Sequence, residues 1–188
     1  MADLLEPVPT TSAPSPFEVL LDYEQRSLAH VAGVPELIDA PGSWRGIAFR
    51  LGGRILVSSI ADVQEILAFP ALTTVPGTQL WLLGVANVRG NLVPVVDLRC
   101  FIEGERAPHK ERSRVLLVRQ SDSSVGVVVD EILGQRAFND SNLIDGMAEE
   151  DDRYQKYIPR FFDWNGTPYR EFSMSALVRA RDFTQAAA

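Results

Sequence analysis

The chain has 188 residues, and 46% of them are hydrophobic, which suffices for one folded domain or for two small ones that share a seam. The formal net charge of −7 at pH 7, without a cluster of Lys or Arg, disfavours a nucleic acid or an anionic membrane as the partner. The single cysteine, Cys100, excludes an internal disulfide, and no apolar run is long enough to span a bilayer, so we expect a cytoplasmic protein.

The first forty or so residues predict a tail followed by one helix. Residues 1–16 are rich in Pro, Ser and Thr and lack periodicity, which is typical of a disordered segment. Residues 15–18, SPFE, form a capping signature with Pro at the first helical position, and apolar residues follow at helical spacing. We therefore expect an amphipathic helix and a linker over residues 17–43, with the helix packed on its own domain.

From Trp44 the apolar residues recur with period two, which is typical of half-buried strands. Residues 44–57 form two such runs around a Gly52-Gly53 turn, and residues 63–68, VQEILA, form a third. This order predicts a hairpin followed by a single strand.

Residues 82–98, LLGVANVRGNLVPVVDL, predict a second hairpin. Its two apolar arms flank Gly90-Asn91, which favours a type II′ turn because Gly takes the first central position. Asp97 closes the second arm, where its side chain can cap a short helix.

The second half of the chain repeats this order of elements. Residues 115–129 predict another hairpin, and VDEIL at 129–133 matches VQEIL at 63–67. A last hairpin turns at Asn165-Gly166, the strongest two-residue turn signal, and a helix follows it. Because strands this short cannot bury two faces of a flat sheet, we expect a mainly β fold of two small five-stranded barrels.

The predicted layout follows from this repeat, and the sequence leaves open whether strands are exchanged between the barrels. It comprises a disordered tail (1–16), a helix and linker (17–43), a two-barrel domain (44–180, with subdomains at about 44–112 and 113–172 and a C-terminal helix) and a tail (181–188).

Motifs for catalysis are missing from the sequence. The two histidines, His30 and His109, lie in no metal-ligand spacing, and neither a nucleophile elbow nor a Walker loop is present. Residues 139–153 end in an acidic run that predicts a solvated loop. We therefore expect no enzyme, cofactor or metal, and a function carried by protein–protein contact. The three tryptophans suit core packing better than ligand stacking: Trp44, Trp81 and Trp164.

Residues 84–99, GVANVRGNLVPVVDLR, resemble the signature of the CheW-type coupling proteins of bacterial chemosensory systems. The shared pattern is a small residue, Asn, an apolar residue, Arg-Gly, apolar residues with Pro, and Asp-Leu. The resemblance spans roughly residues 46–177 and implies two SH3-like barrels in a non-enzymatic adaptor. It also implies the partners: the cytoplasmic tip of a methyl-accepting chemoreceptor and the regulatory domain of a CheA-type histidine kinase. Such an adaptor is cytoplasmic and recruited to membrane-associated receptor arrays, without direct membrane insertion.

Two matched segments imply where the partners bind. The family's NxRG element lies in its receptor and kinase contact region, and its V-Q-E-I strand adjoins that surface. We hypothesise an ion pair between Glu65 and Arg89, worth only about 0–1 kcal/mol for stability, so its value would lie in partner choice. A third segment, with Val127, Val129 and Asp130, matches a second-barrel strand and suits core packing. The implied protein-binding residues are Val63, Gln64, Glu65, Ile66, Asn87, Val88, Arg89 and Gly90.

Two departures from the common family pattern favour one branch of it. The N-terminal region is longer than in ordinary chemotaxis couplers, and the last hairpin, RFFDWNGTPYREF, lacks the usual aliphatic run. With FEVLLDYEQRSLA and SWRGIAFRLGG, these features resemble the branch that serves type IV pili and twitching motility. The alternatives are a coupling protein of flagellar chemotaxis and, from another class, a small-barrel nucleic-acid-binding protein.

Overall fold

A computed structural model describes residues 15–29, 43–106, 108–120, 123–146, 148–149 and 151–186. The chain divides into an N-terminal unit, residues 1–38, and a β-rich unit, residues 39–188. In the N-terminal unit, α1 (Pro16–Ala29) begins where the capping signature predicts. The predicted disordered tail lies almost wholly outside the described residues, as does most of the predicted linker, and the packing of α1 on its own domain stays a prediction.

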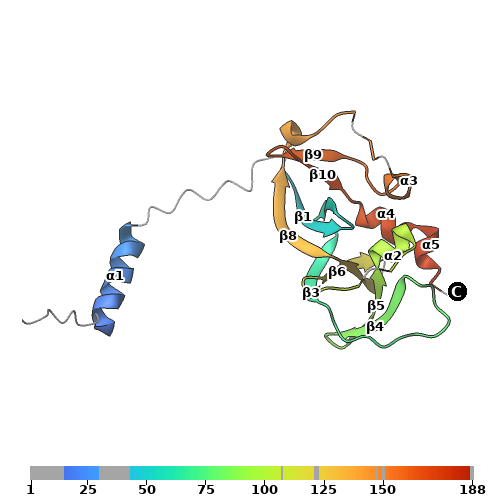
Figure 1. The fold of residues 1–188 in the computed structure, drawn as a ribbon, viewed down its shortest axis with the longest axis horizontal. Coiled ribbons are helices and arrows are strands. Elements are labelled where there is room, and N and C mark those ends of the chain that lie inside the picture. Colours follow the sequence, from blue (N-terminus) through green and yellow to red (C-terminus); the bar gives the residue numbers. More distant parts are fainter. Residues whose placement is uncertain are drawn as a thin grey trace, which may run out of the picture. The chain divides into compact units, whose positions relative to one another are not determined.

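The β-rich unit is built from short strands joined by tight turns, with helices only at a few corners (Figure 1). Its strands are β1 (Trp44–Leu51), β2 (Arg54–Ser59), β3 (Val63–Ala68), β4 (Leu82–Val88), β5 (Asn91–Asp97), β6 (Arg114–Gln120), β7 (Ser123–Val129), β8 (Glu131–Phe138), β9 (Phe161–Trp164) and β10 (Thr167–Glu171). Its helices are α2 (Leu98–Glu103), η1 (Asp140–Asn142, a 3-10 turn), α3 (Asp152–Gln155), α4 (Met174–Arg179) and α5 (Arg181–Thr184).

The strands form two five-stranded sheets, which confirms the predicted mainly β fold class. The first sheet has the order β8-β1-β2-β10-β9, and the second has the order β3-β6-β7-β5-β4. In the first sheet, Phe138 of edge strand β8 stacks on Phe162 of edge strand β9, with ring centroids 4.6 Å apart. The two edges of this sheet therefore meet over one small core, as in a barrel.

The two sheets exchange strands between the repeats. The third strand of each repeat pairs with the hairpin of the other repeat, β3 with β6 and β8 with β1. Only Asp130 separates β7 from β8. A one-residue connection is too short for a hairpin turn, so β8 cannot pair back onto β7 and joins the other sheet. The predicted sequential subdomains, 44–112 and 113–172, are therefore wrong as a description of the sheets.

Three cores result from this exchange. Each sheet encloses a small core of its own, and a larger core fills the space between the two sheets. β1 serves two of them, because Ala48 faces the core of the first sheet whereas Ile47 and Phe49 face the shared core. This explains why several strands are apolar on both faces.

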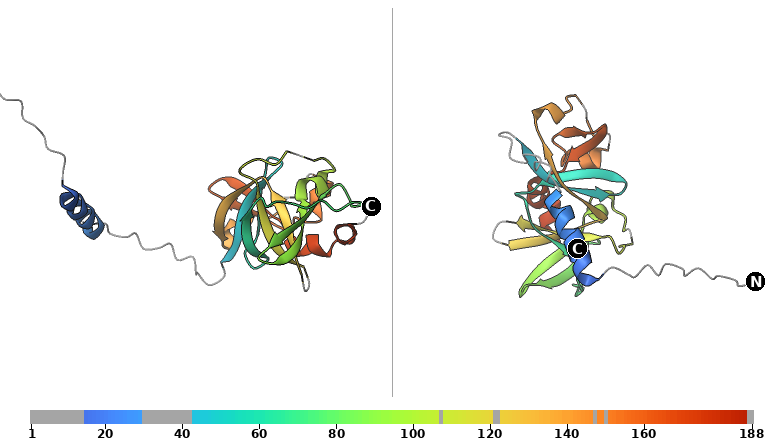
Figure 2. Two further views of the ribbon diagram at one scale, coloured as in Figure 1. Left: turned by 90° about the horizontal axis from the view of Figure 1, so that it is seen from below. Right: turned by 90° about the vertical axis from the view of Figure 1, so that its left-hand side faces the viewer.

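α2 and the C-terminal helices α4 and α5 lie side by side and close one edge of the shared core (Figures 1 and 2). α2 and α4 follow equivalent hairpins and have equivalent caps: Asp97 accepts from the amide of Cys100, and Ser173 accepts from that of Ala176. The predicted cap at Asp97 is thus confirmed. The predicted tail at 181–188 is wrong in its first part, since α5 buries Phe183 against Trp81 with centroids 5.6 Å apart.

Candidate protein-binding groove

The tip of the β4–β5 hairpin differs by one residue from the turn that the sequence predicts. Val88 pairs with Asn91, so the two turn residues are Arg89 and Gly90 rather than Gly90 and Asn91. Both have positive φ, 52° and 87°, as a type I′ turn requires. The side chain of Asn87 supports the turn, because its Oδ1 accepts from the amide of Gly90 at 2.8 Å.

This turn directs Arg89 toward β3. Its Nη2 donates to Oε1 of Glu65 at 2.6 Å, which confirms the hypothesised ion pair. The Arg89 side chain is 77% exposed, so the pair adds at most about 1 kcal/mol to stability. A non-glycine residue with positive φ also costs backbone energy. Stability therefore gives little reason for Arg at this position.

A β-bulge in β3 changes the direction in which the neighbouring side chains point. Val63 pairs with Val118 and Glu65 with Leu117, so Gln64 is an extra residue in a β-bulge. In a regular strand Gln64 and Glu65 would face opposite sides, but a bulge re-aims side chains. Here Oε1 of Gln64 accepts from the hydroxyl of Ser124 on β7 at 2.7 Å.

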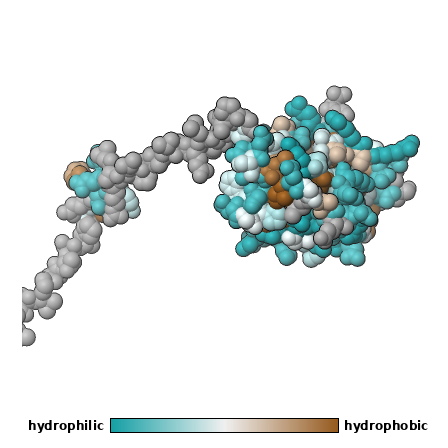
Figure 3. Space-filling view, turned by 90° about the horizontal axis from the view of Figure 1, so that it is seen from above, coloured by the Kyte–Doolittle hydropathy of each residue, from teal (hydrophilic) through white to brown (hydrophobic). Residues whose placement is uncertain are grey.

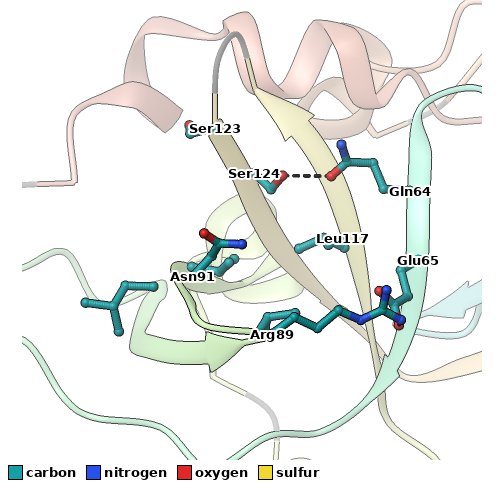
Figure 4. Close-up of a pocket in the computed structure, with 10 residues that line it drawn as sticks. Gln64, Glu65, Arg89, Asn91, Leu117, Ser123 and Ser124 are labelled. Atoms are coloured by element: carbon teal, nitrogen blue, oxygen red, sulfur yellow. Dashed lines mark hydrogen bonds and ion pairs between the residues drawn. The ribbon is translucent and has the colours of Figure 1, made fainter.

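The hairpin tip and β3 bound one groove of about 580 Å³, which we call the hairpin groove (Figure 4). In Figure 4 the Arg89 side chain extends toward Glu65, and Gln64 meets Ser124 farther along the groove. Apolar side chains from three strands lie among these polar groups, which suits a partner that offers an apolar contact with a polar rim. The lining residues are Gln64, Glu65, Val88, Arg89, Asn91, Leu92, Val93, Leu117, Ser123 and Ser124.

Four of the eight predicted protein-binding residues line this groove, namely Gln64, Glu65, Val88 and Arg89. The other four do not. Asn87 and Gly90 shape the turn, Val63 packs against the shared core, and Ile66 is exposed on the outer side of β3.

The structure adds residues that the sequence prediction missed. Leu92 lies 75% exposed at the groove, although it belongs to a run treated as uniformly apolar. Because residues 92–96 are all apolar, no alternation in the sequence distinguishes exposed Leu92 from buried Val93 and Val95. Leu117 and Ser124 come from β6 and β7, and nothing local predicts their approach to the hairpin tip.

Exposed apolar side chains are few elsewhere on the described β-rich unit. The face in Figure 3 carries a compact apolar patch within a mostly hydrophilic surface. Such a surface suits contacts with other proteins. The large apolar residues exposed on this unit are Ile60, Ile66, Val75, Leu80, Leu92 and Leu143.

The described residues contain no cluster of His, Cys, Asp and Glu that could hold a metal ion. His109 stacks on Phe69 at 4.7 Å and lies 3.9 Å from Asp97. Cys100 is buried, and burial raises the pKa of its thiol, which makes it a poor nucleophile. None of the described helices is long and apolar enough to cross a membrane.

Two residues of the acidic run, Glu149 and Asp151, are not solvated as its composition predicts, whereas Asp152 is exposed. Glu149 is buried and pairs with Arg170 at 2.7 Å and with Arg54 at 3.7 Å. Asp151 pairs with Arg54 at 2.9 Å and caps α3. These ion pairs hold the segment against β2 and β10, which supply the two arginines. Both strands are separated from the run in the chain, so no local sequence pattern predicts the pairing.

Comparisons with known proteins agree with this fold. A family model described as a CheW-like domain matches residues 45–182. The chain is 36% identical over 173 residues to Protein PilI of Pseudomonas aeruginosa, a match covering 92% of this chain and 97% of that protein. It is 32% identical over 85 residues to Chemotaxis protein CheW of Bacillus subtilis, which covers 45% of this chain and 54% of that protein.

A solved structure shares the same architecture. The scaffolding protein TtCheW from Thermoanaerobacter tengcongensis superposes with a TM-score of 0.62 at 18% identity, over 72% of this chain and 88% of that one. The two five-stranded sheets are therefore a known arrangement.

Proposed function

Because the chain belongs to the CheW-like family of non-enzymatic scaffold proteins, we propose that it couples chemoreceptors to a CheA-type histidine kinase in a pathway controlling type IV pili and twitching motility. Its partners in this proposal are the cytoplasmic tip of a methyl-accepting chemoreceptor and the regulatory domain of the kinase. The protein acts in the cytoplasm, recruited to membrane-associated receptor arrays.

The choice of the pilus pathway rests on the similarity to PilI. That match extends over nearly the whole of both chains, whereas the match to the Bacillus CheW covers less than half of this one. A coupling protein of flagellar chemotaxis is the second candidate. A nucleic-acid-binding role has little support, because the chain is acidic overall.

The observation that carries the proposed docking site is the Glu65–Arg89 pair across the hairpin groove. An exposed ion pair on a strained turn adds little stability, so we assign Arg89 to partner recognition. Charge at an interface acts mainly on specificity and association rate. The proposed protein-binding residues are those predicted from the sequence, with Leu92, Leu117 and Ser124 added.

The test is Arg89→Glu in a pull-down with the kinase regulatory domain and, separately, with the receptor tip. Reversal places two carboxylates together at the groove, and we expect affinity to fall by about tenfold or more, ~1.4 kcal/mol. Arg181→Glu is the matched control, since Arg181 is also exposed and lies on α5, outside the groove. Wild-type binding of both partners by a folded Arg89→Glu variant would refute the assigned surface.

A further inference from the structure

A second groove lies at the opposite end of the β6–β7 hairpin. The hairpin groove takes in Ser123 at the start of β7, whereas the second groove takes in Asp130 just beyond its end. Six residues of strand separate these ends by ~20 Å. The two grooves share no lining residue.

The second groove, about 590 Å³ in volume, is rich in positive charge, and we call it the cationic groove. It holds four cationic side chains and two carboxylates, in a chain whose net charge is −7. Two glycines of the β1–β2 turn leave part of its wall without side chains. The lining residues are Arg50, Gly52, Gly53, Arg99, Pro108, Lys110, Arg112, Asp130 and Glu131.

The carboxylates within the cationic groove are already engaged. Glu131 is shared by two guanidinium groups, at 3.6 Å from Arg50 and 3.4 Å from Arg112. Asp130 accepts from the backbone amide of Gly52 at 2.8 Å. Within the described residues the ammonium group of Lys110 has no partner. Arg99 is paired with Glu103, outside the lining, at 2.7 Å. The excess of positive charge therefore comes from Lys110 and from the two guanidinium groups that share Glu131.

We infer that the cationic groove docks an acidic segment of a protein partner. The inference rests on the proposed adaptor function, to which it adds a second docking surface. Arginine presents several N–H donors in a planar fork that matches a carboxylate, so a partner Asp or Glu can join Arg112 without displacing Glu131. Arg112 is 80% exposed and free to make that contact.

The lining favours a peptide over a nucleic acid. Among the described residues, no aromatic side chain lines the groove, so it offers bases no stacking surface. Asp130 and Glu131 lie within it and repel a continuous row of phosphates, whereas spaced carboxylates can avoid them. Lys110 and Arg112 are exposed, whereas Arg50 and Arg99 are half-buried, so binding through the exposed pair should weaken as salt screens the charges.

The probe is a fluorescein-labelled octapeptide of alternating Glu and Gly, titrated with the full chain. We expect binding that weakens severalfold when NaCl rises from about 0.05 to about 0.3 M, and little binding of a Gln-Gly octapeptide. The variant Lys110→Glu/Arg112→Glu should bind the acidic peptide at least tenfold more weakly. Arg181→Glu, an exposed control outside both grooves, should bind it as the wild type does.

Several outcomes would overturn the inference: equal binding by the double variant, equal binding of the Gln-Gly peptide, or tighter binding of an oligothymidylate. Binding that appears only after the acidic residues of the N-terminal unit are neutralised would also overturn it, because this chain's own N-terminal segment would then be the occupant. Failure here leaves the pull-down with Arg89→Glu unaffected, since that experiment uses other probes and another groove. The two proposals can therefore fail separately.

Discussion

At the scale of single residues, a comparison of two equivalent hairpin tips shows that Arg89 is unfavourable for the backbone conformation of its turn. The β9–β10 tip has Asn165-Gly166 in the same type I′ geometry, with Asp163 accepting from the amide of Gly166 at 2.7 Å. Asn tolerates positive φ well, whereas Arg does not. The β4–β5 tip thus carries a residue poorly suited to its own turn.

The substitution Arg89→Asn gives the β4–β5 tip the Asn-Gly sequence of its counterpart. Losing an exposed ion pair costs little, and relieving the backbone offsets it, so the free energy of unfolding should stay unchanged or rise by up to about 1 kcal/mol. Partner binding in the pull-down should nevertheless fall. Urea unfolding checks the first expectation, and a loss of more than about 1 kcal/mol would contradict it.

Arg54 is a second residue whose environment makes a sharp prediction. It pairs with Glu103 and Asp151 at 3.4 and 2.9 Å and lies over the ring of Tyr154. Arg54→Met leaves these carboxylates partly buried and less well paired. The expected loss is about 2 kcal/mol, below the ~3–5 kcal/mol of a fully buried pair because Arg54 is partly exposed.

The matched control is Arg99→Met, which removes another partner of Glu103. Arg99 lies one helical turn before Glu103 on α2, and such a pair contributes less than about 1 kcal/mol. Comparable unfolding midpoints in urea for the two variants would show that Arg54 has no special structural role.

At the scale of elements, the contact of α2 with the segment at residues 151–155 makes the stability of the fold depend on pH. Burial disfavours the charged form of Glu103, but hydrogen bonds from Arg99 and Tyr154, together with nearby Arg54, outweigh it and hold its pKa below the ordinary 4.5. Hydrogen bonds from Arg153 lower the pKa of Asp151 from 3.8 to about 2.

Acid should therefore destabilise the fold. Because both pKa values are lower in the folded chain, the unfolded chain takes up protons first as pH falls. The stabilisation is fully present above about pH 4.5 and is lost progressively toward about pH 2. Urea midpoints measured across this range should fall, and Asp151→Asn should show a smaller fall than the wild type.

The elements also show which structural features can be predicted from sequence patterns and which cannot. The strand at 63–68, the cap at Asp97 and the Glu65–Arg89 pair could be predicted, because each depends on local periodicity or on a family motif. The bulge at Gln64 and the burial of Glu149 could not, because each is set by strands distant along the chain.

At the scale of the whole molecule, the exchanged strands join the two repeats. β3 pairs with β6, β5 pairs with β7 on the edge away from β4, and β1 pairs with β8 on the edge away from β2. The repeat VQEIL/VDEIL revealed that two units exist but not which strands pair. Pairing between distant strands leaves no periodic trace in the sequence.

The exchange predicts that the two halves cannot fold alone. Fragments 1–112 and 113–188 should each lack a cooperative unfolding transition, since the first contains β3 and β5 without their partners β6 and β7. Mixed or co-expressed, they should regain a β-rich circular dichroism spectrum. A cooperative transition in the isolated first fragment would contradict this.

The order of the strands along the chain also determines which sheet can form first during synthesis on the ribosome. Residues 63–129 supply every strand of the second sheet, so that sheet can assemble while the rest of the chain is still being made. β1 and β2 emerge earliest among the strands yet keep both outer edges unpaired until β8 and β10 arrive. Open strand edges recruit other chains. A translation product that stalls after residue 129 therefore has a complete second sheet but two open edges at β1 and β2, and it should aggregate more readily than the full chain.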